Sequence, residues 1–336
     1  MRRLAIVVSA LILVGCAAPV PVDSDAALSN VLSPDEPGCS AAVGRNGEVV
    51  WAGARGLANL DTGEALTSNS VFDMASVSKQ FTATAVLLLE QDGELSLDDS
   101  LADWVDDLPA DADEISLADL MHHTSGIADY TNLLDAELSE TTTQQDAVDA
   151  IAKLPQLRDG DGFSYSNSNY VLLAEVVEAA SGMPLAEFLD ERVFGPLELD
   201  MRLEPVYDGP NVAISYEDGE PVEAGWLQVG DGSIYTTPSE LVRWADNYRT
   251  GTVGGSALLD AQITDGADTG AGSTYAAGVE VAADGSLSHL GEWAGFVTIF
   301  GITADRSTAI AVMCNSTDAN AEAVAEGLEA IWHAGD

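Results

Sequence analysis

Strand-like segments lie at both ends of this chain and are separated by a long stretch with helical patterning. Near the start, "CSAAVGR" and "EVVWAGARGL" flank Asn46-Gly47, a dipeptide typical of a tight β-hairpin. From about residue 274 the strand pattern returns in "TYAAGVEVA", "SLSHLG", "GFVTIFGI" and "TAIAVMC". Segments so far apart share one core when they pair in a single sheet. We therefore predict an α+β fold, with one sheet built from about 38–60 and 274–336 and an inserted, mainly helical region at about 72–250.

Apolar residues recur at helical spacing through the middle of the chain. The clearest segment, residues 76–92, ends at Gly93, a residue type that commonly terminates helices. Further helices are predicted at 116–122, 144–154, 168–180, 184–193 and 238–249, and a last one in "NAEAVAEGLEAIWHA". No internal repeat is found, and one domain is expected over residues 36–336.

The N-terminal segment "MRRLAIVVSALILVGCAAP" has the features of an export signal. Two arginines precede an apolar run from Leu4 to Val14, which is too short to span a bilayer. Because small residues and Cys16 follow, the segment resembles a bacterial lipoprotein lipobox. We expect a signal peptide at 1–15, a lipid anchor on Cys16 and a tether at 16–35, with an ordinary signal peptide as the alternative. The domain is then exported and lipid-anchored at the cell envelope.

Acidic residues outnumber basic residues by 56 to 12, and the formal net charge is -44. Such a surface repels nucleic-acid phosphates and anionic lipids, so nucleic acid is excluded as a partner and the lipid anchor is the expected membrane contact. The acids are spread through every segment, which disorder explains poorly. At about 1 M salt the Debye length is only about 3 Å, so neighbouring carboxylates hardly interact. The composition therefore indicates a halophilic or salt-tolerant protein.

Only two lysines occur in the chain, and Lys79 lies three residues after Ser76. On a helix this spacing brings both side chains to one face. A serine hydroxyl needs a base to become a nucleophile, and a buried lysine can share or accept a proton. The pair alone is a weak signal, because a solvated Ser–Lys pair is common. The apolar segment "FTATAVLLL" that follows favours a buried, functional lysine, and Ser78 is interpreted as structural.

Two further motifs contain groups that can act on an acyl substrate. Tyr165-Ser166-Asn167 precedes the helix predicted at 168–180, and there Tyr can act as a general base and Asn can bind a carbonyl. His289-Leu290-Gly291 lies on a predicted strand, where the glycine permits close approach of a ligand to the strand edge. Each motif alone is ordinary loop or strand sequence.

Ser-x-x-Lys, Tyr-x-Asn and His-x-Gly, in this order, resemble the serine β-lactamase and penicillin-binding protein superfamily. Within it the chain is similar to the branch of class C β-lactamases, D-alanyl-D-alanine carboxypeptidases and related esterases. Other stretches agree, including "DLMHHTSGI", "YSNSNYVLLAEVVEAASG", "GDGSIYTTPSELVRWA" and "GEWAGF". The resemblance covers roughly residues 36–330. It implies a β-lactamase/transpeptidase-like fold, with an antiparallel sheet and flanking helices, and an enzyme that hydrolyses small-molecule or peptide acyl substrates. A monomer without cofactor or metal is expected.

The resemblance also implies a role for each motif residue. Ser76 attacks an acyl carbonyl to form an acyl-enzyme, while Lys79 and Tyr165 move the proton. Asn167 holds the substrate amide, and His289 orients substrate and supports Tyr165. The backbone N–H groups of Ser76 and Glu292, which follows Gly291, form the oxyanion hole.

This sequence departs from the pattern at Leu290. Relatives that process β-lactams or D-alanyl peptides usually have Thr or Ser there, whose hydroxyl donates to the substrate carboxylate. Leucine offers no donor, and His289 is mostly neutral at pH 7. We therefore expect a poor β-lactamase that prefers neutral esters or amides.

Three other interpretations were weighed. An α/β-hydrolase triad is disfavoured because no Gly-x-Ser-x-Gly occurs, and a zinc hydrolase because adjacent His122 and His123 cannot share one helix face. These two histidines are expected to brace a loop near the site. A non-catalytic lipoprotein that binds cell-wall peptides remains the alternative function.

Cys39 begins the first predicted strand of the sheet and Cys314 ends the last one. In the fold that the resemblance implies, these strands are antiparallel neighbours, which permits a disulfide between the two residues. Two buried free thiols are the equal alternative, because the register is not known from sequence.

Overall fold

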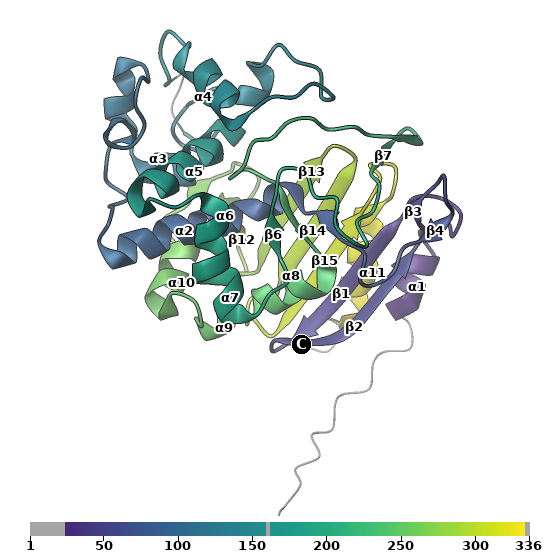
Figure 1. Cartoon of the computed structure of the whole chain (residues 1–336). Coiled ribbons are helices and arrows are strands. Elements are labelled where there is room, and N and C mark those ends of the chain that lie inside the picture. Colours follow the sequence, from purple (N-terminus) through teal and green to yellow (C-terminus); the bar gives the residue numbers. More distant parts are fainter. Residues whose placement is uncertain (1–23, 159–161, 333–336) are drawn as a thin grey trace, which may run out of the picture.

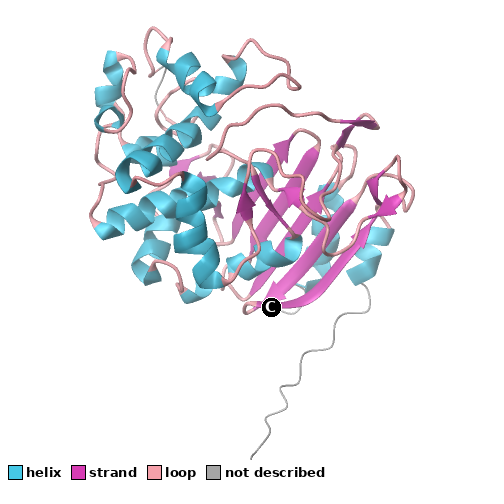
Figure 2. Cartoon of the chain, in the orientation of Figure 1, coloured by secondary structure: helices cyan, strands magenta, loops and turns pink. Residues whose placement is uncertain are grey.

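The computed structural model describes residues 24–158 and 162–332. Its centre is an eight-stranded antiparallel sheet in the order β10-β11-β12-β13-β14-β15-β1-β2, with helices on both faces (Figures 1 and 2). The strands of this sheet are β1 (Cys39–Arg45), β2 (Glu48–Arg55), β10 (Ala267–Asp268), β11 (Ser273–Tyr275), β12 (Glu280–Ala282), β13 (Leu287–Trp293), β14 (Phe296–Ile302) and β15 (Thr308–Cys314). The predicted α+β fold with a sheet made from both chain ends is therefore confirmed.

The two ends of the chain meet where β1 pairs with β15. Cys39 lies opposite Cys314 and Arg45 lies opposite Thr308. The β1–β2 hairpin turns at Asn46 and Gly47, whose φ angles of 49° and 84° suit the predicted Asn-Gly turn. The sheet begins earlier than expected in its C-terminal part, because β10 starts at Ala267.

Alternating side chains of β1 face two different helical layers. Ala41 and Val43 pack with helices α1 (Ser24–Ser29) and α11 (Ala321–Trp332), whereas Ala42 belongs to the larger core on the other face. In α1, Leu28 is 3% exposed. Residues 24–35 therefore belong to the folded part of the chain, and the expected tether up to residue 35 is wrong there. Six residues with tether-like composition become helical because α11 covers their apolar side chains.

The inserted region between β2 and β10 is mainly helical, as predicted. Its helices are α2 (Lys79–Asp92), α3 (Leu117–Met121), α4 (Gln144–Ala152), α5 (Asn167–Ser181), α6 (Leu185–Leu189), α7 (Gly195–Leu197), α8 (Pro238–Ala245), α9 (Asn247–Thr250) and α10 (Gly255–Ile263), with short helical turns η1 (Ala75–Ser78), η2 (Leu101–Asp103), η3 (Ala110–Glu114), η4 (Tyr130–Asn132) and η5 (Asp190–Phe194). The helix expected at 184–193 is α6 followed by the wider π-helical turn η5. The helix expected at 238–249 is divided into α8 and α9.

Small sheets also occur in the insertion, and the sequence did not predict them. They are β3 (Leu57–Asn59) with β4 (Glu64–Ala65), β9 (Ile234–Thr236) between β5 (Phe72–Asp73) and β6 (Arg202–Leu203), and β7 (Tyr216–Glu217) with β8 (Glu220–Pro221). The three-stranded sheet matters for the site, because β5 runs directly into the segment that carries Ser76.

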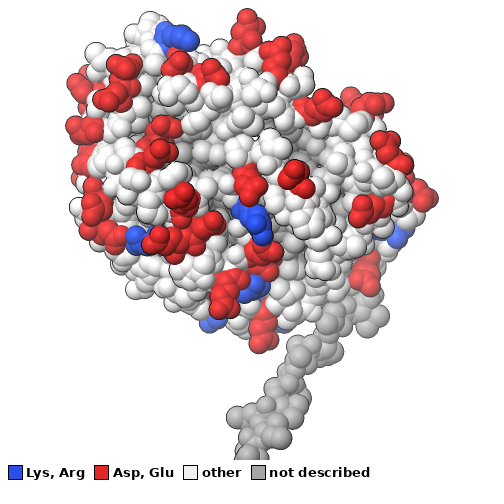
Figure 3. Space-filling view, in the orientation of Figure 1, with Lys and Arg blue, Asp and Glu red and all other residues white. Residues whose placement is uncertain are grey.

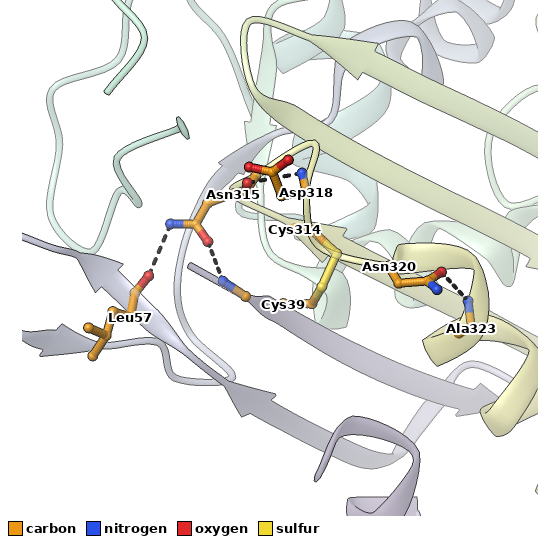
Figure 4. Close-up of a disulfide and its surroundings, with 9 residues drawn as sticks. Cys39, Leu57, Cys314, Asn315, Asp318, Asn320 and Ala323 are labelled. Carbon is orange, nitrogen blue, oxygen red and sulfur yellow. Dashed lines mark hydrogen bonds between the residues drawn. A yellow bond between two sulfur atoms is a disulfide. The ribbon is translucent and has the colours of Figure 1, made fainter. Parts of the chain in front are cut away.

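Cys39 and Cys314 are joined by a disulfide, which links the first and last strands of the sheet (Figure 4). Their Cα atoms are 4.0 Å apart, slightly closer than in most disulfides. The neighbouring Asn315 accepts a hydrogen bond from the Gly38 amide and donates one to the Leu57 carbonyl (Figure 4). The end of the β1–β15 pair near Cys39 and Cys314 is therefore stabilised by side-chain bonds as well as by strand pairing.

The surface in Figure 3 carries many more carboxylates than basic groups. They are dispersed over the visible face, as the even spread of acids along the sequence suggested. Within residues 24–158 and 162–332, no helix is both long and apolar enough to cross a membrane. The segment with the expected signal peptide and Cys16 lies outside the described residues.

Candidate active site

Ser76 lies in a tight turn between β5 and α2. Ala75, just before it, has a φ of 50°, a conformation that is unfavourable for a residue with a Cβ. The Asp73 carboxylate accepts the Ala75 amide at 2.8 Å and fixes this turn. Strain held in place by the surrounding structure is common at functional sites. The turn presents Ser76 at the start of the helical segment η1–α2.

Lys79 is fully buried and lies beside Ser76, as the i to i+3 spacing predicted. Its Nζ donates to the Ser76 hydroxyl at 2.9 Å, to Asn167 Oδ1 at 2.8 Å and to the Asp231 backbone carbonyl at 2.7 Å. An ammonium group has three N–H donors, so every one is used. The position of Lys79 is therefore fixed by three acceptors on three separate segments.

Tyr165 and Asn167 lie where the chain enters α5. The Tyr165 ring centroid is 5.1 Å from Lys79 Nζ, and the side chain is 39% exposed. None of the described residues forms a hydrogen bond with its hydroxyl group, which leaves that group open to a substrate or water. Asn167 receives its orientation from Asp129, which accepts the Asn167 backbone amide at 2.9 Å and the side-chain amide at 3.0 Å. Its carbonyl oxygen is consequently turned toward Lys79.

His289 and Leu290 point to opposite faces of β13. The Leu290 side chain is 52% exposed, and His289 is 6% exposed. His289 Nδ1 lies 2.7 Å from the Leu290 carbonyl, so it donates, and Nε2 accepts from the Tyr275 hydroxyl at 3.0 Å. Burial, together with the charge of Lys79, lowers the pKa of His289 to about 3. Both ring nitrogens are therefore bonded within the protein, and the expected direct contact of His289 with a substrate does not fit this arrangement.

Gly291 lets β13 lie directly against the Ser76 turn. A Cβ at this position would overlap the Met74 carbonyl oxygen and would lie 3.0 Å from the Ser76 amide nitrogen. The sequence predicted that a ligand would approach the strand closely at Gly291. In the structure, the segment that approaches β13 there is the Ser76 turn of the same chain. It brings the Ser76 amide beside the backbone that continues to Glu292.

An open cleft of about 410 Å³ lies in front of Ser76. It contains Ser76, Asn167 and Glu292 of the predicted site residues, and its other lining residues are Ala75, Tyr130, Trp226, Gln228, Asp231, Gly232, Ser233 and Trp293. Tyr130 and Trp293 each pack against Trp226, with ring centroids 6.1 and 5.7 Å apart. The cleft thus has an aromatic wall and two carboxylate side chains, Asp231 and Glu292.

Two carboxyl groups with a raised pKa lie close to the Ser76 turn, Asp73 in the interior and the half-buried Asp231 in the wall of the cleft. Burial raises the pKa of Asp73 to about 7, although its bond from the Ala75 amide opposes this shift. Burial also raises the pKa of Asp231, and the charge of Lys79 opposes this rise. The Tyr130 hydroxyl donates to Asp231 at 3.0 Å. Asp231 therefore contributes a carbonyl to Lys79 and a carboxyl group to the cleft.

Sequence reasoning missed several residues of this site. Asp231 lies in "GDGSIYTT", a stretch that contributed to the resemblance, but its contact with Lys79 is through the backbone and has no side-chain signature. Asp129, Tyr130 and Trp226 lie in segments without a recognisable motif. Among the described residues, no group of three or more His, Cys, Asp or Glu side chains could hold a metal ion.

Several known proteins are similar to this chain in sequence or in fold. Penicillin-binding protein 4* of Bacillus subtilis (strain 168) is 28% identical over 284 residues, which cover 75% of this chain and 62% of that protein. Esterase EstB of Burkholderia gladioli is 33% identical over 211 residues, which cover 55% of this chain and 51% of the esterase. The chain thus spans less than two thirds of the length of these curated relatives.

Among solved structures, D-amino acid amidase from Ochrobactrum anthropi SV3, complexed with L-phenylalanine, matches with a TM-score of 0.78 at 24% identity. The match covers 94% of this chain and 100% of the amidase, and at this identity it shows a shared fold. A family model described as beta-lactamase matches residues 27–331. Since this match spans nearly all of the described fold, the chain belongs to the beta-lactamase family, within the superfamily of β-lactamase- and transpeptidase-like serine hydrolases.

Proposed function

We propose that this chain hydrolyses ester or amide bonds through an acyl-enzyme on Ser76. The observation that carries the proposal is the position of Lys79, whose Nζ lies 2.9 Å from the Ser76 hydroxyl while two other acceptors fix it. Lys79 is fully buried, all three of its N–H groups are bonded, and one of them is bonded to the serine that lines the cleft, which suits a role in proton transfer. The open hydroxyl of Tyr165 supplies a second proton-transfer group near the same charge.

The reaction then runs in two steps. Ser76 Oγ attacks the acyl carbonyl when the Lys79–Tyr165 pair holds one proton fewer than an ammonium and a phenol together. The pair accepts the Ser76 proton and passes a proton to the leaving group, and an acyl ester remains on Ser76. In the second step water attacks this ester, gives up its proton to the same pair, and Ser76 regains its hydroxyl proton. We assign the oxyanion hole to the backbone N–H groups of Ser76 and Glu292, which the close approach at Gly291 brings together.

The cleft favours substrates without a carboxylate beside the scissile bond. Leu290 has no hydrogen-bond donor, the His289 ring is neutral and bonded within the protein, and the cleft is lined by Asp231 and Glu292. Each feature disfavours an anionic substrate. Short esters and amides are therefore the expected substrates, in keeping with the names of the similar esterase and amidase.

Covalent labelling tests the proposal. The protein in molar KCl is incubated with a fluorophosphonate probe or with benzylpenicillin, and its mass is measured before and after. One adduct per chain, located on Ser76 and lost in Ser76→Ala, is the expected result, together with hydrolysis of p-nitrophenyl butyrate. Binding of cell-wall peptides without any adduct or turnover would instead support the non-catalytic alternative.

Export and lipid anchoring at Cys16 form a separate part of the proposal, supported by the sequence at positions 1–16. Expression of the full chain with a radiolabelled fatty acid should label the wild type and not Cys16→Ala. Equal labelling of the two forms, or release of both into the medium, would contradict the anchor.

A further inference from the structure

The His123 imidazole lies directly beneath Tyr165. The two ring centroids are 4.2 Å apart with an interplanar angle of 33°, and His123 is fully buried. Lys79 also lies near this tyrosine, with its Nζ 5.1 Å from the tyrosine ring centroid. The buried His123 ring therefore limits how far the Tyr165 ring can move relative to Lys79.

The same histidine also binds the backbone on both sides of Tyr165. The Ser164 amide donates to the His123 carbonyl at 2.8 Å, and the Ser166 amide donates to His123 Nδ1 at 3.2 Å. Tyr165 is thus flanked by two hydrogen bonds to one residue. A backbone shift that carried Tyr165 away from Lys79 would break at least one of them, while the contact with the His123 ring limits the movement of the side chain.

The imidazole is held in one tautomer. Asn169 Nδ2 lies 2.9 Å from His123 Nδ1, and the Asn169 carbonyl oxygen accepts from Ser125 at 2.6 Å, which fixes the amide orientation. Nδ1 therefore accepts two N–H donors, and the proton is on Nε2. Burial and the neighbouring Lys79 charge hold the pKa of His123 well below its usual range, so the ring stays neutral beside the ammonium.

The backbone at His123 adopts the left-handed conformation. Its φ is 56°, and it lies two residues after the end of α3, where helices prefer Gly or Asn. Histidine is one of the residue types with a Cβ that adopt this conformation more readily than most. The turn therefore accommodates a histidine, whose side chain contacts Tyr165.

We propose that His123 is a positioning residue for the reaction: by two hydrogen bonds and a ring contact it holds the Tyr165 ring over Lys79. This inference rests on the proposed function, since it gives Tyr165 a place in proton transfer. It goes beyond the loop-bracing role expected from "LMHHTSGI", because it names the atom contacts and the side chain on which they act.

Two variants separate the ring contact from the hydrogen bonds. His123→Asn suits the positive φ and places an amide oxygen near the position of Nδ1, but it removes the ring. His123→Phe retains a ring and removes the acceptor for Ser166 and Asn169. We expect kcat for p-nitrophenyl butyrate to fall about 10-fold in His123→Asn and about 100-fold in His123→Phe, with KM changed less than threefold, because a misplacement near 1 Å costs about that much. His122→Asn is the matched control, since its ring makes none of these contacts, and it should retain wild-type kcat.

A double-mutant cycle tests whether the effect passes through Tyr165. In a Tyr165→Phe background, which itself lowers kcat, the change to His123→Asn should cost less than a further twofold. An undiminished 10-fold loss in that background would overturn the inference, as would wild-type kcat in both single variants. Labelling of Ser76 by the fluorophosphonate probe is measured in parallel: its absence in the wild type would refute the proposed function, whereas normal labelling with additive kcat losses would refute only the role of His123. His123→Asn keeps the buried donors paired, so it remains informative if His123→Phe fails to fold.

Discussion

The contact between β13 and the Ser76 turn predicts a large effect for a single methyl group. In Gly291→Ala the new Cβ would lie 3.0 Å from the Ser76 nitrogen and still closer to the Met74 carbonyl oxygen. Ordinary contacts of this kind are about 3.5 Å or longer, so strand and turn must separate by roughly 1 Å. Both opposing atoms belong to the backbone, which cannot rotate away as a side chain can.

Two magnitudes follow from this displacement. Overpacking of a dense interior costs about 1–3 kcal/mol of unfolding free energy, which lowers Tm by several degrees for a domain of this size. A shift of about 1 Å between the nucleophile and the expected oxyanion hole lowers kcat/KM about 100-fold. The activity loss should therefore exceed what the modest loss of stability explains, because the protein stays folded at the assay temperature.

Gly301→Ala provides the matched control on the adjacent strand β14. The nearest atoms to its new Cβ are 3.9 Å away, at Glu329 Oε1 and the Leu287 carbonyl oxygen. Thermal unfolding and p-nitrophenyl butyrate hydrolysis are measured for both variants in molar KCl. We expect the control to keep wild-type Tm within about 2 °C and wild-type activity. If Gly291→Ala retains wild-type kcat/KM, the close approach of β13 to Ser76 is not what assembles the site.

Three further predictions concern charge and specificity. Leu290→Thr adds a donor at a half-exposed position and should raise kcat/KM about 10- to 150-fold for carboxylate-bearing substrates only; an equal gain for p-nitrophenyl butyrate would contradict this. Because the pKa of Asp73 is raised to about 7 in the fold from an ordinary 3.8, wild-type stability declines as pH rises between these values. Asp73→Asn lacks this term, so its stability relative to the wild type should increase from pH 4 to pH 7 and stay constant above, as chemical denaturation at several pH values would show. Because screening reduces repulsion among 56 acidic residues, both stability and kcat/KM should rise from dilute buffer to molar KCl, and equal values would refute the halophilic interpretation.

The parts of the fold that sequence predicted are those with a strong local signal. The β1–β2 hairpin follows from Asn46-Gly47, and Ser76 meets Lys79 because a spacing of three residues within one helical segment leaves little freedom. The pairing of β1 with β15 needed the resemblance, since alternating patterns do not specify which remote strands become neighbours. Even that pairing did not fix the register, so the disulfide between Cys39 and Cys314 stayed one of two equal alternatives until the structure placed the two residues opposite each other.

The parts that sequence did not predict depend on contacts between remote segments. Strands β5, β6 and β9 have two or three residues each, too few to show any alternation. Asp231 accepts the Lys79 ammonium through its backbone carbonyl. Every residue has such a carbonyl, so this contact leaves no signal in the sequence. His289 was expected to face the substrate because its motif resembled a binding motif. Its actual orientation follows from the strict alternation of β13, in which residues 287, 289 and 291 are buried and 288, 290 and 292 are exposed.

The three bonds of Lys79 explain why a chain so poor in lysine retains one at this position. Ser76, Asn167 and the Asp231 carbonyl surround Nζ at 2.7 to 2.9 Å, and a compact ammonium directs its three N–H groups to just such separate acceptors. An arginine guanidinium is planar, has five donors and remains charged throughout, so it would leave donors unpaired in the same buried space and could not take part in proton transfer. Surface positions have no such requirement, and on the face shown in Figure 3 acidic side chains far outnumber basic ones. The hydrogen-bond geometry around the buried Lys79 amine thus explains why this lysine occurs in a chain that has only two.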